Sequence, residues 1–371
     1  MPDADQDAML RRLTDELRSS ARWDELFEAQ LLAARRRLGM PLTDDGGSAA
    51  GSAAAAPELT AAYREACLEA GRGWLALGQH RRAWPYLRAC GAQQTMRDAL
   101  RLATPDSESA DALIEVALFE GACPALGAEW LIEHSGTCAA VTTLEQLVGQ
   151  FDPPDAVACA AVLVRRLHHE LVENLTGAVL RSGQAPPNHR EVGRLLAEHP
   201  GLMEGGGSHV DASHLTSAVR LARLLEEPED VRLAGELAQY GERLDADWLP
   251  NDPPPFEAFF PTHRLLLDAT LGERVEEALA YFRSRAEEPV EPYSASSAAE
   301  TLLVLLGRLG RDREALRFYA ALAQQDRATP FSSYAPAPLM LAKRSGEWEA
   351  YDRLMGLRDD PVGLALGRLS R

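Results

Sequence analysis

The sequence predicts an all-α protein, and three observations support that expectation. Apolar residues recur at spacings of three and four through most of the chain, which places them on one face of a helix. Glycines and prolines divide the chain into segments of roughly ten to twenty residues, which predicts about sixteen helices. No segment shows the sustained two-residue alternation of β-branched and aromatic side chains that is typical of a strand.

Residues 1–39 are expected to form an N-terminal helical hairpin. Trp23, Leu26, Phe27 and Leu38 fall on one side of its second helix, which should end where a glycine and a proline follow Leu38. The hairpin would pack through this apolar side.

Residues 40–57 are expected to form a flexible linker. The run TDDGGSAAGSAAAAP at 43–57 has no large side chain to bury, so it cannot offset the entropy lost on ordering. Residues 58–371 would form a helical-repeat body. Its breakers are Gly78, Gly91, Pro105, Gly121, Gly136, Pro153, Pro186, Gly201, Pro228, Pro250, Gly272, Pro289, Gly310, Pro330, Gly346 and Pro361.

A spacing of small and aromatic residues stands out within residues 67–90. Gly71, Trp74, Gly78, Ala83 and Leu87 resemble the pattern of a tetratricopeptide repeat. The resemblance implies two antiparallel helices that approach closely at Gly71 and Ala83, with Trp74 and Leu87 filling the groove and Gly78 making the turn.

Weaker versions of the pattern follow later in the chain. Residues 301–322 repeat it around Gly310, although Leu303 stands where a small residue is expected. Residues 272–282 match in part, with one extra residue in the turn, and residues 346–354 form a shortened version. Repeats of this kind stack into an α-α superhelix with an extended concave surface, so a solenoid is the expected architecture.

Residues 209–225 also resemble segments of uncharacterised bacterial helical-repeat proteins, as do residues 252–272. This resemblance implies no activity.

Composition and charge narrow the classes of partner. Asp and Glu number 56 against 38 Lys and Arg, which gives a net charge of −18. Nucleic-acid binding requires clustered basic residues, and the short basic runs at 35–37 and 81–82 fit solvated helix faces better. We therefore expect a protein or peptide partner, basic rather than acidic, and no nucleic acid.

Cysteine usage and hydropathy indicate a cytoplasmic protein. The five cysteines are odd in number and form no C-x-x-C pair, which is typical of free thiols in a reducing compartment. The first residues are acidic where a signal peptide would be basic and then apolar. No stretch approaches the about 18 consecutive apolar residues of a membrane helix, so no membrane association is expected.

One cluster carries metal-ligating chemistry. His209, Asp211 and His214 lie together at the start of a helical run, and two imidazoles with one carboxylate suit zinc with an open coordination position. The alternative is structural: Asp211 is well placed to cap the helix, because its carboxylate can accept from backbone N–H groups two or three residues on.

The other polar clusters have structural interpretations. His168 lies near the apolar stripe of a long helix, whereas His169 and Glu173 lie on its far, solvated side. Asp152 precedes a proline and should cap that helix. The glycine-rich loop at 201–207 lacks the lysine of a phosphate loop, and Phe256 begins an aromatic corner that we expect to close a helix pair.

These observations favour an interaction or scaffold protein without a cofactor. The alternative is an enzyme or metal-binding protein on a closed helical toroid, centred on His209, Asp211 and His214. A scaffold should present an open groove, whereas an enzyme should gather perturbed titratable groups in one deep pocket.

Overall fold

The computed structural model describes residues 3–42, 52–204, 208–250, 252, 255–287, 292–325, 331–332 and 334–371. Helix makes up 76% of the chain, and the described residues contain no strand, which confirms the all-α prediction. The described residues hold 19 α-helices rather than about sixteen. The count differs because several helices, such as α6 (Ala110–Ile114) and α10 (Val192–Glu198), are shorter than the segments on which the prediction rested.

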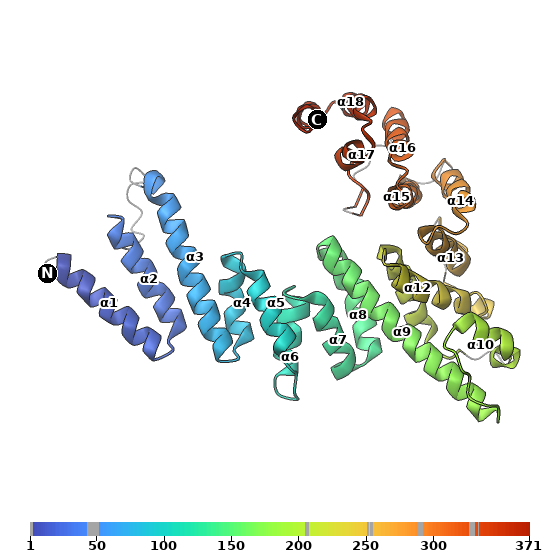
Figure 1. Ribbon diagram of the computed structural model, residues 1–371, viewed down its shortest axis with the longest axis horizontal. Helices are drawn as coiled ribbons and strands as arrows, with labels where there is room; N and C mark the ends of the chain where they lie inside the picture. Colours follow the sequence, from blue (N-terminus) through green and yellow to red (C-terminus); the bar gives the residue numbers. More distant parts are fainter. Residues whose placement is uncertain are drawn as a thin grey trace. The chain divides into compact units, whose positions relative to one another are not determined.

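The chain divides into two compact units, Met1–His134 and Ser135–Arg371 (Figure 1). Each is described by itself. The first unit contains α1 (Asp3–Ser19), α2 (Trp23–Arg37), α3 (Ser52–Ala76), α4 (His80–Ala89), α5 (Gln93–Leu102), α6, the π-helix η2 (Glu115–Phe119) and α7 (Pro124–Ser135).

Helix α1 packs against α2, and α2 packs closely on α3. The indole of Trp23 lies so close to Gly73 that a Cβ there would meet ring atoms at 2.2 Å. Asp24 accepts hydrogen bonds from Trp74 Nε1 at 2.8 Å and Tyr86 Oη at 2.9 Å. Helix α2 is therefore joined to α3 and α4 by packing as well as by the chain.

The expected linker over residues 40–57 lies partly outside the described residues, which omit 43–51. Helix α3 begins at Ser52, inside the expected linker.

The helix pair α3 and α4 has the close contact that the sequence pattern predicts. A Cβ on Gly71 would meet Leu87 side-chain atoms at 2.7 Å and the Ala83 carbonyl oxygen at 3.5 Å. The turn between the helices contains Gly78 at φ +70°, a left-handed conformation that glycine adopts without steric cost. Trp74 and Leu87 are buried, at 7% and 0% exposure.

The second unit is also helical throughout its described residues. It contains α8 (Thr137–Leu147), η3 (Val148–Gln150), α9 (Pro153–Arg181), α10, η4 (Pro200–Met203), α11 (Ala212–Leu221), η5 (Ala222–Leu224), α12 (Pro228–Gly241), η6 (Ala246–Trp248), α13 (Phe259–Thr270), α14 (Val275–Glu287), α15 (Pro292–Arg308), α16 (Asp312–Gln324), α17 (Pro338–Ser345), α18 (Trp348–Leu357) and α19 (Pro361–Leu369).

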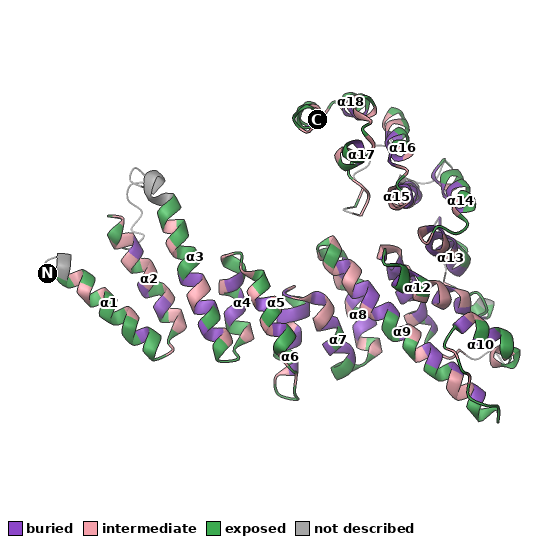
Figure 2. Cartoon of the chain, in the orientation of Figure 1, coloured by how far each residue is buried: buried purple, intermediate pink, exposed green. Residues whose placement is uncertain are grey.

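A continuous apolar core joins α13 through α18 in this unit. Phe256 and Phe282 contribute large buried rings to it, and Ala315, Tyr319 and Leu322 of the second repeat-like segment are buried with them. Figure 2 shows buried and exposed residues alternating along these helices, as expected when each helix buries one face against its neighbours.

The contact at Gly71 generates a stability prediction. Gly71→Leu should lower the free energy of unfolding by about 1–3 kcal/mol, because the new side chain must overpack the contact with Leu87. Gly235→Leu is the matched control, since Gly235 also lies within a helix but a Cβ there meets nothing within 4 Å. Chemical denaturation of both variants measures the difference. Equal stability of the two variants would show that α3 and α4 do not meet at Gly71.

Candidate functional site

A pocket of about 1080 Å³ lies within the second unit. It is bordered by α8, α9, α11, the segment 208–211 and the segment 247–250. Its charged lining residues are Glu145, Glu170, Asp211, Asp247 and Arg220. Because pockets of this size with convergent polar groups are the usual places of ligand binding, it is the candidate site.

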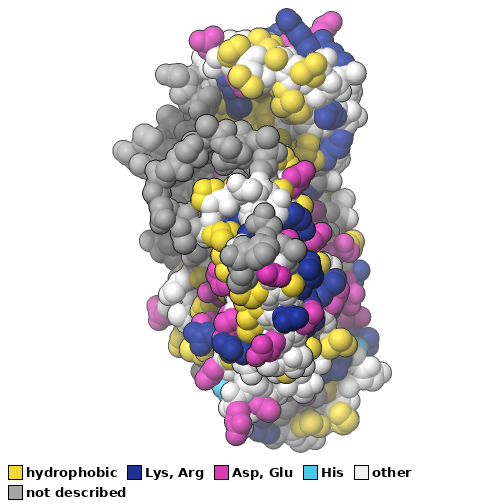
Figure 3. All heavy atoms as spheres, turned by 90° about the vertical axis from the view of Figure 1, so that its left-hand side faces the viewer, with side chains coloured by type: hydrophobic (Ala, Val, Ile, Leu, Met, Phe, Trp, Pro, Cys, Tyr) yellow, Lys and Arg dark blue, Asp and Glu magenta, His cyan; other side chains and the backbone are white. Residues whose placement is uncertain are grey.

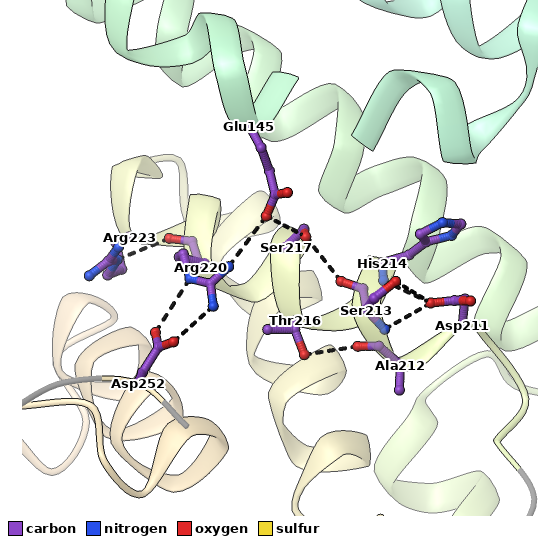
Figure 4. A network of polar contacts seen from close by, with 10 residues as sticks. All are labelled: Glu145, Asp211, Ala212, Ser213, His214, Thr216, Ser217, Arg220, Arg223 and Asp252. Atoms are coloured by element: carbon purple, nitrogen blue, oxygen red, sulfur yellow. Dashed lines mark hydrogen bonds and ion pairs between the residues drawn. The ribbon is translucent and has the colours of Figure 1, made fainter. Parts of the chain in front are cut away.

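One wall of the pocket carries a network centred on Arg220 (Figure 4). Arg220 Nη2 lies 2.9 Å from Asp252 Oδ1, and Nη1 lies 3.3 Å from Glu145 Oε1. Ser217 Oγ donates to Glu145 Oε1 at 2.6 Å. The guanidinium thus ties α11 to α8 and to the segment before α13.

Glu145, Ser217, Arg220 and Asp252 are not among the site residues predicted from the sequence. A local signal did exist for two of them. Ser217 lies four residues after Ser213, and Arg220 lies three residues after Ser217, so the three residues share one face of α11. Their acidic partners had no such signal, because they come from distant parts of the chain.

Asp211 occupies the N-cap of α11, as predicted. Its Oδ1 accepts from the backbone N–H groups of Ser213 at 2.8 Å and His214 at 3.2 Å. The Ser213 hydroxyl also donates to it, and these hydrogen bonds hold the pKa of Asp211 below its usual value. The carboxylate therefore stays ionised while it caps the helix.

His209 is tied to the buried Tyr240 rather than to Asp211. Its backbone N–H donates to Tyr240 Oη at 2.8 Å, and its Nδ1 lies 3.0 Å from the same oxygen. Because the Tyr240 oxygen accepts from the backbone N–H, its own hydroxyl proton can be donated to Nδ1. Nε2 is then the protonated ring nitrogen of His209. Burial, with a smaller effect from Arg181, lowers the pKa of His209 and keeps the ring neutral.

The structure does not assemble His209, Asp211 and His214 as a ligand set. The hydrogen bond between His214 and Asp211 uses the histidine backbone, and the Asp211 carboxylate is directed at the helix end. Among the described residues no group of three or more His, Cys, Asp and Glu side chains is placed to hold a metal ion. The metal site at His209, Asp211 and His214 stays a prediction.

The remaining candidates from the sequence have structural contacts. His168 Nε2 lies 2.9 Å from Glu236 Oε2, whereas His169 is exposed and Glu173 pairs with Arg190. Asp152 stands at the N-cap of α9, but its side chain makes no capping hydrogen bond. The glycine-rich loop falls partly outside the described residues, which omit 205–207.

The aromatic corner encloses a buried histidine that the sequence analysis did not single out. His263 is 0% exposed, and its ring centroid lies 4.2 Å from those of both Phe256 and Phe259. Nδ1 donates to the Phe259 carbonyl oxygen at 2.7 Å, whereas Nε2 has no partner among the described residues. Burial, aided by the charge of Arg223, lowers the pKa of His263 to about 3.

No family model, curated protein or solved structure matches this chain. In the described part of the chain, no helix combines the length and the apolar character needed to cross a membrane.

The N-cap geometry predicts how two substitutions differ. Asp211→Asn should leave stability nearly unchanged, because asparagine caps about as well as aspartate, whereas Asp211→Ala should cost about 0.5–2 kcal/mol. Thermal melts of both variants, with and without a chelator, measure this. If chelation destabilised the wild-type protein and Asp211→Asn abolished that effect, Asp211 would be a metal ligand and not only a cap.

The buried imidazole predicts a pH dependence of stability. The pKa of His263 in the folded protein lies below the usual value near 6.5, so the unfolded chain binds more protons between those two pKa values. His263 therefore costs no stability above about pH 6.5 and progressively destabilises the fold as the pH falls toward about 3.

His263→Phe should remove that loss. Between pH 7 and pH 5, the free energy of unfolding should fall by about 2 kcal/mol less in this variant than in the wild-type protein. Urea denaturation at both pH values measures the difference, with the exposed His169→Gln as control. An unchanged pH dependence in His263→Phe would show that the histidine is not held neutral.

Proposed function

We propose that this protein binds a basic segment of a protein partner in the pocket between α8, α9 and α11. The observation that carries the proposal is the charge of the lining. Four carboxylate residues, Glu145, Glu170, Asp211 and Asp247, line the pocket together with a single arginine, Arg220. That arginine is already paired with two carboxylates, so the lining is net negative.

The four carboxylates differ in how much they can offer a ligand, and the Oδ1 of Asp211 is already engaged in capping α11. Glu145 accepts from Ser217 and Arg220, and Glu170 accepts from Thr137 Oγ1 at 2.6 Å and from Arg166. These contacts hold the side chains in place while leaving lone pairs unused, because a carboxylate can accept about four hydrogen bonds. Asp247 is exposed and makes no ion pair within the described residues.

Exposed apolar side chains border the acidic lining. Trp248 is 50% exposed and Leu249 is 47% exposed, and both line the pocket. An indole face attracts the cationic groups of Lys and Arg, and it also covers the apolar stem of such side chains. An acidic pocket bordered by tryptophan and leucine thus complements a segment that carries both basic and apolar residues.

The proposal also concerns the arrangement of the helix pairs in the chain. We infer that the pairs around Gly71 and Gly310 are tetratricopeptide-like repeats and that the chain forms an α-α superhelix whose concave surface receives the partner. The close contact at Gly71, the glycine turns and the burial of Ala315 support this inference. On the face shown in Figure 3, acidic and basic side chains are interspersed.

The test uses a fluorescein-labelled peptide of alternating arginine and leucine and measures fluorescence anisotropy at about physiological ionic strength. Trp248→Ala should weaken binding by roughly five- to thirtyfold, since an aromatic side chain that becomes covered by the ligand contributes about 1–2 kcal/mol to binding. Asp247→Asn should weaken it two- to fivefold, as expected for an exposed charge worth up to about 1 kcal/mol.

The matched control is Glu229→Gln. It removes the same charge from an exposed position on α12 outside the pocket, so its affinity for the peptide should equal that of the wild-type protein. If Glu229→Gln and Asp247→Asn weakened binding equally, the peptide would be responding to net charge alone and the pocket would not be its site.

A further inference from the structure

A second pocket in the same unit has a different chemical character. It encloses about 350 Å³ and is bordered by η3, η5, α13 and α15. Most of its lining is apolar and comes from Val148, Leu221, Leu224, Leu266 and Val304. The polar lining residues are Arg220, Arg223, Glu300, Thr301 and Tyr334.

Arg223 is the unusual member of this lining. Its Nε donates to the Arg220 carbonyl oxygen at 3.0 Å, and its guanidinium lies over the ring of Phe256, 4.8 Å from the centroid. Within the described residues it has no carboxylate at ion-pair distance. Partial burial, together with the nearby charge of Arg220, lowers the pKa of Arg223.

The neighbouring acidic groups are engaged elsewhere. Asp252 holds Arg220 through both of its oxygens, at 2.9 Å and 3.3 Å, and Glu300 accepts from the Ser332 hydroxyl. Both raise the pKa of Arg223 only through space. The two terminal nitrogens of Arg223 are therefore left with their donors unused by protein groups of the described residues.

The Arg223 side chain is half-buried. Shielding a guanidinium from water without an anion beside it costs free energy, and the ring of Phe256 offsets only part of that cost. A bound anion would balance the charge of the Arg223 guanidinium and accept hydrogen bonds from its terminal nitrogens. The planar fork of arginine matches a carboxylate in two parallel hydrogen bonds, which are among the stronger hydrogen bonds in proteins.

We propose that this pocket binds a small monocarboxylate with an apolar body. The carboxylate pairs with Arg223, and the apolar body lies against Leu224, Leu266 and Val304. A single planar charge suits the site better than a phosphate, because the lining is mostly apolar and Glu300 would repel a dianion. The phenol of Tyr334, whose pKa is raised by burial, keeps its proton and is an additional donor to such a ligand.

This site does not rest on the proposed binding of a basic segment. Arg220 lines both pockets, but Arg223 and Val304 line only the smaller one. Substitutions at those two residues therefore test the carboxylate site separately.

The experiment is a calorimetric titration of the full chain with 4-phenylbutanoate, which combines a carboxylate with an apolar body. Two control compounds separate the contributions: 4-phenylbutan-1-ol has the body without the charge, and acetate has the charge without the body. We expect 4-phenylbutanoate to bind and both control compounds to bind at least tenfold more weakly.

Arg223→Met keeps much of the side-chain length but removes the charge, and should weaken binding of 4-phenylbutanoate by roughly ten- to hundredfold. Arg194→Met is the control, because Arg194 is 51% exposed on α10 and should not affect binding. Val304→Phe fills the pocket from its apolar wall and should also abolish binding, so the test does not depend on one variant. Circular dichroism establishes that each variant folds.

Three results would overturn the proposal. The first is that 4-phenylbutanoate fails to bind the folded wild-type protein at millimolar concentration. The second is that the alcohol binds as tightly as the acid. The third is that the folded Arg223→Met variant retains wild-type affinity, in which case the stacking on Phe256 alone accounts for the position of the guanidinium.

Discussion

The close approach of neighbouring helices is the constraint on which the rest of this structure depends. At Gly71 and Gly241 a neighbouring side chain occupies the place where a Cβ would stand, Leu87 in one case and the ring of Phe260 in the other. Interiors are packed so densely that such contacts leave no room for an added methyl group. The two helices of each pair are therefore held at a fixed distance, which also fixes the positions of the polar groups on their adjoining faces.

Arg220 shows what that fixed spacing allows. It stands on α11 between Glu145 of α8 and Asp252 of the segment before α13, and the two carboxylates satisfy most of its donors. Arg223, one turn further along the chain, has no such partners in the described residues. Two arginines three residues apart thus have opposite roles: one closes a structural network, and the other offers unused donors to a pocket.

The ligands that we propose for the two pockets therefore have opposite charges. The larger one has a net negative lining with exposed Trp248, which suits a basic partner. In the smaller one the Arg223 guanidinium, which has no carboxylate partner among the described residues, adjoins an apolar wall, and we propose an apolar carboxylate as its ligand. The net charge of −18 would have suggested only the first, because total charge does not report how individual groups are paired.

The sequence by itself determined what depends on neighbouring residues: the helical periodicity, the cap at Asp211, and the small residue at Gly71 with its partner Leu87. Capping and close helix contact act over one turn or between adjacent helices, so residue type and spacing reveal them. Only the tertiary structure decided that His209 turns to Tyr240 and that Ser217 meets Glu145, 72 residues away. Such pairs arise from packing between distant helices and leave no periodic pattern in the sequence, so residue spacing alone does not reveal them.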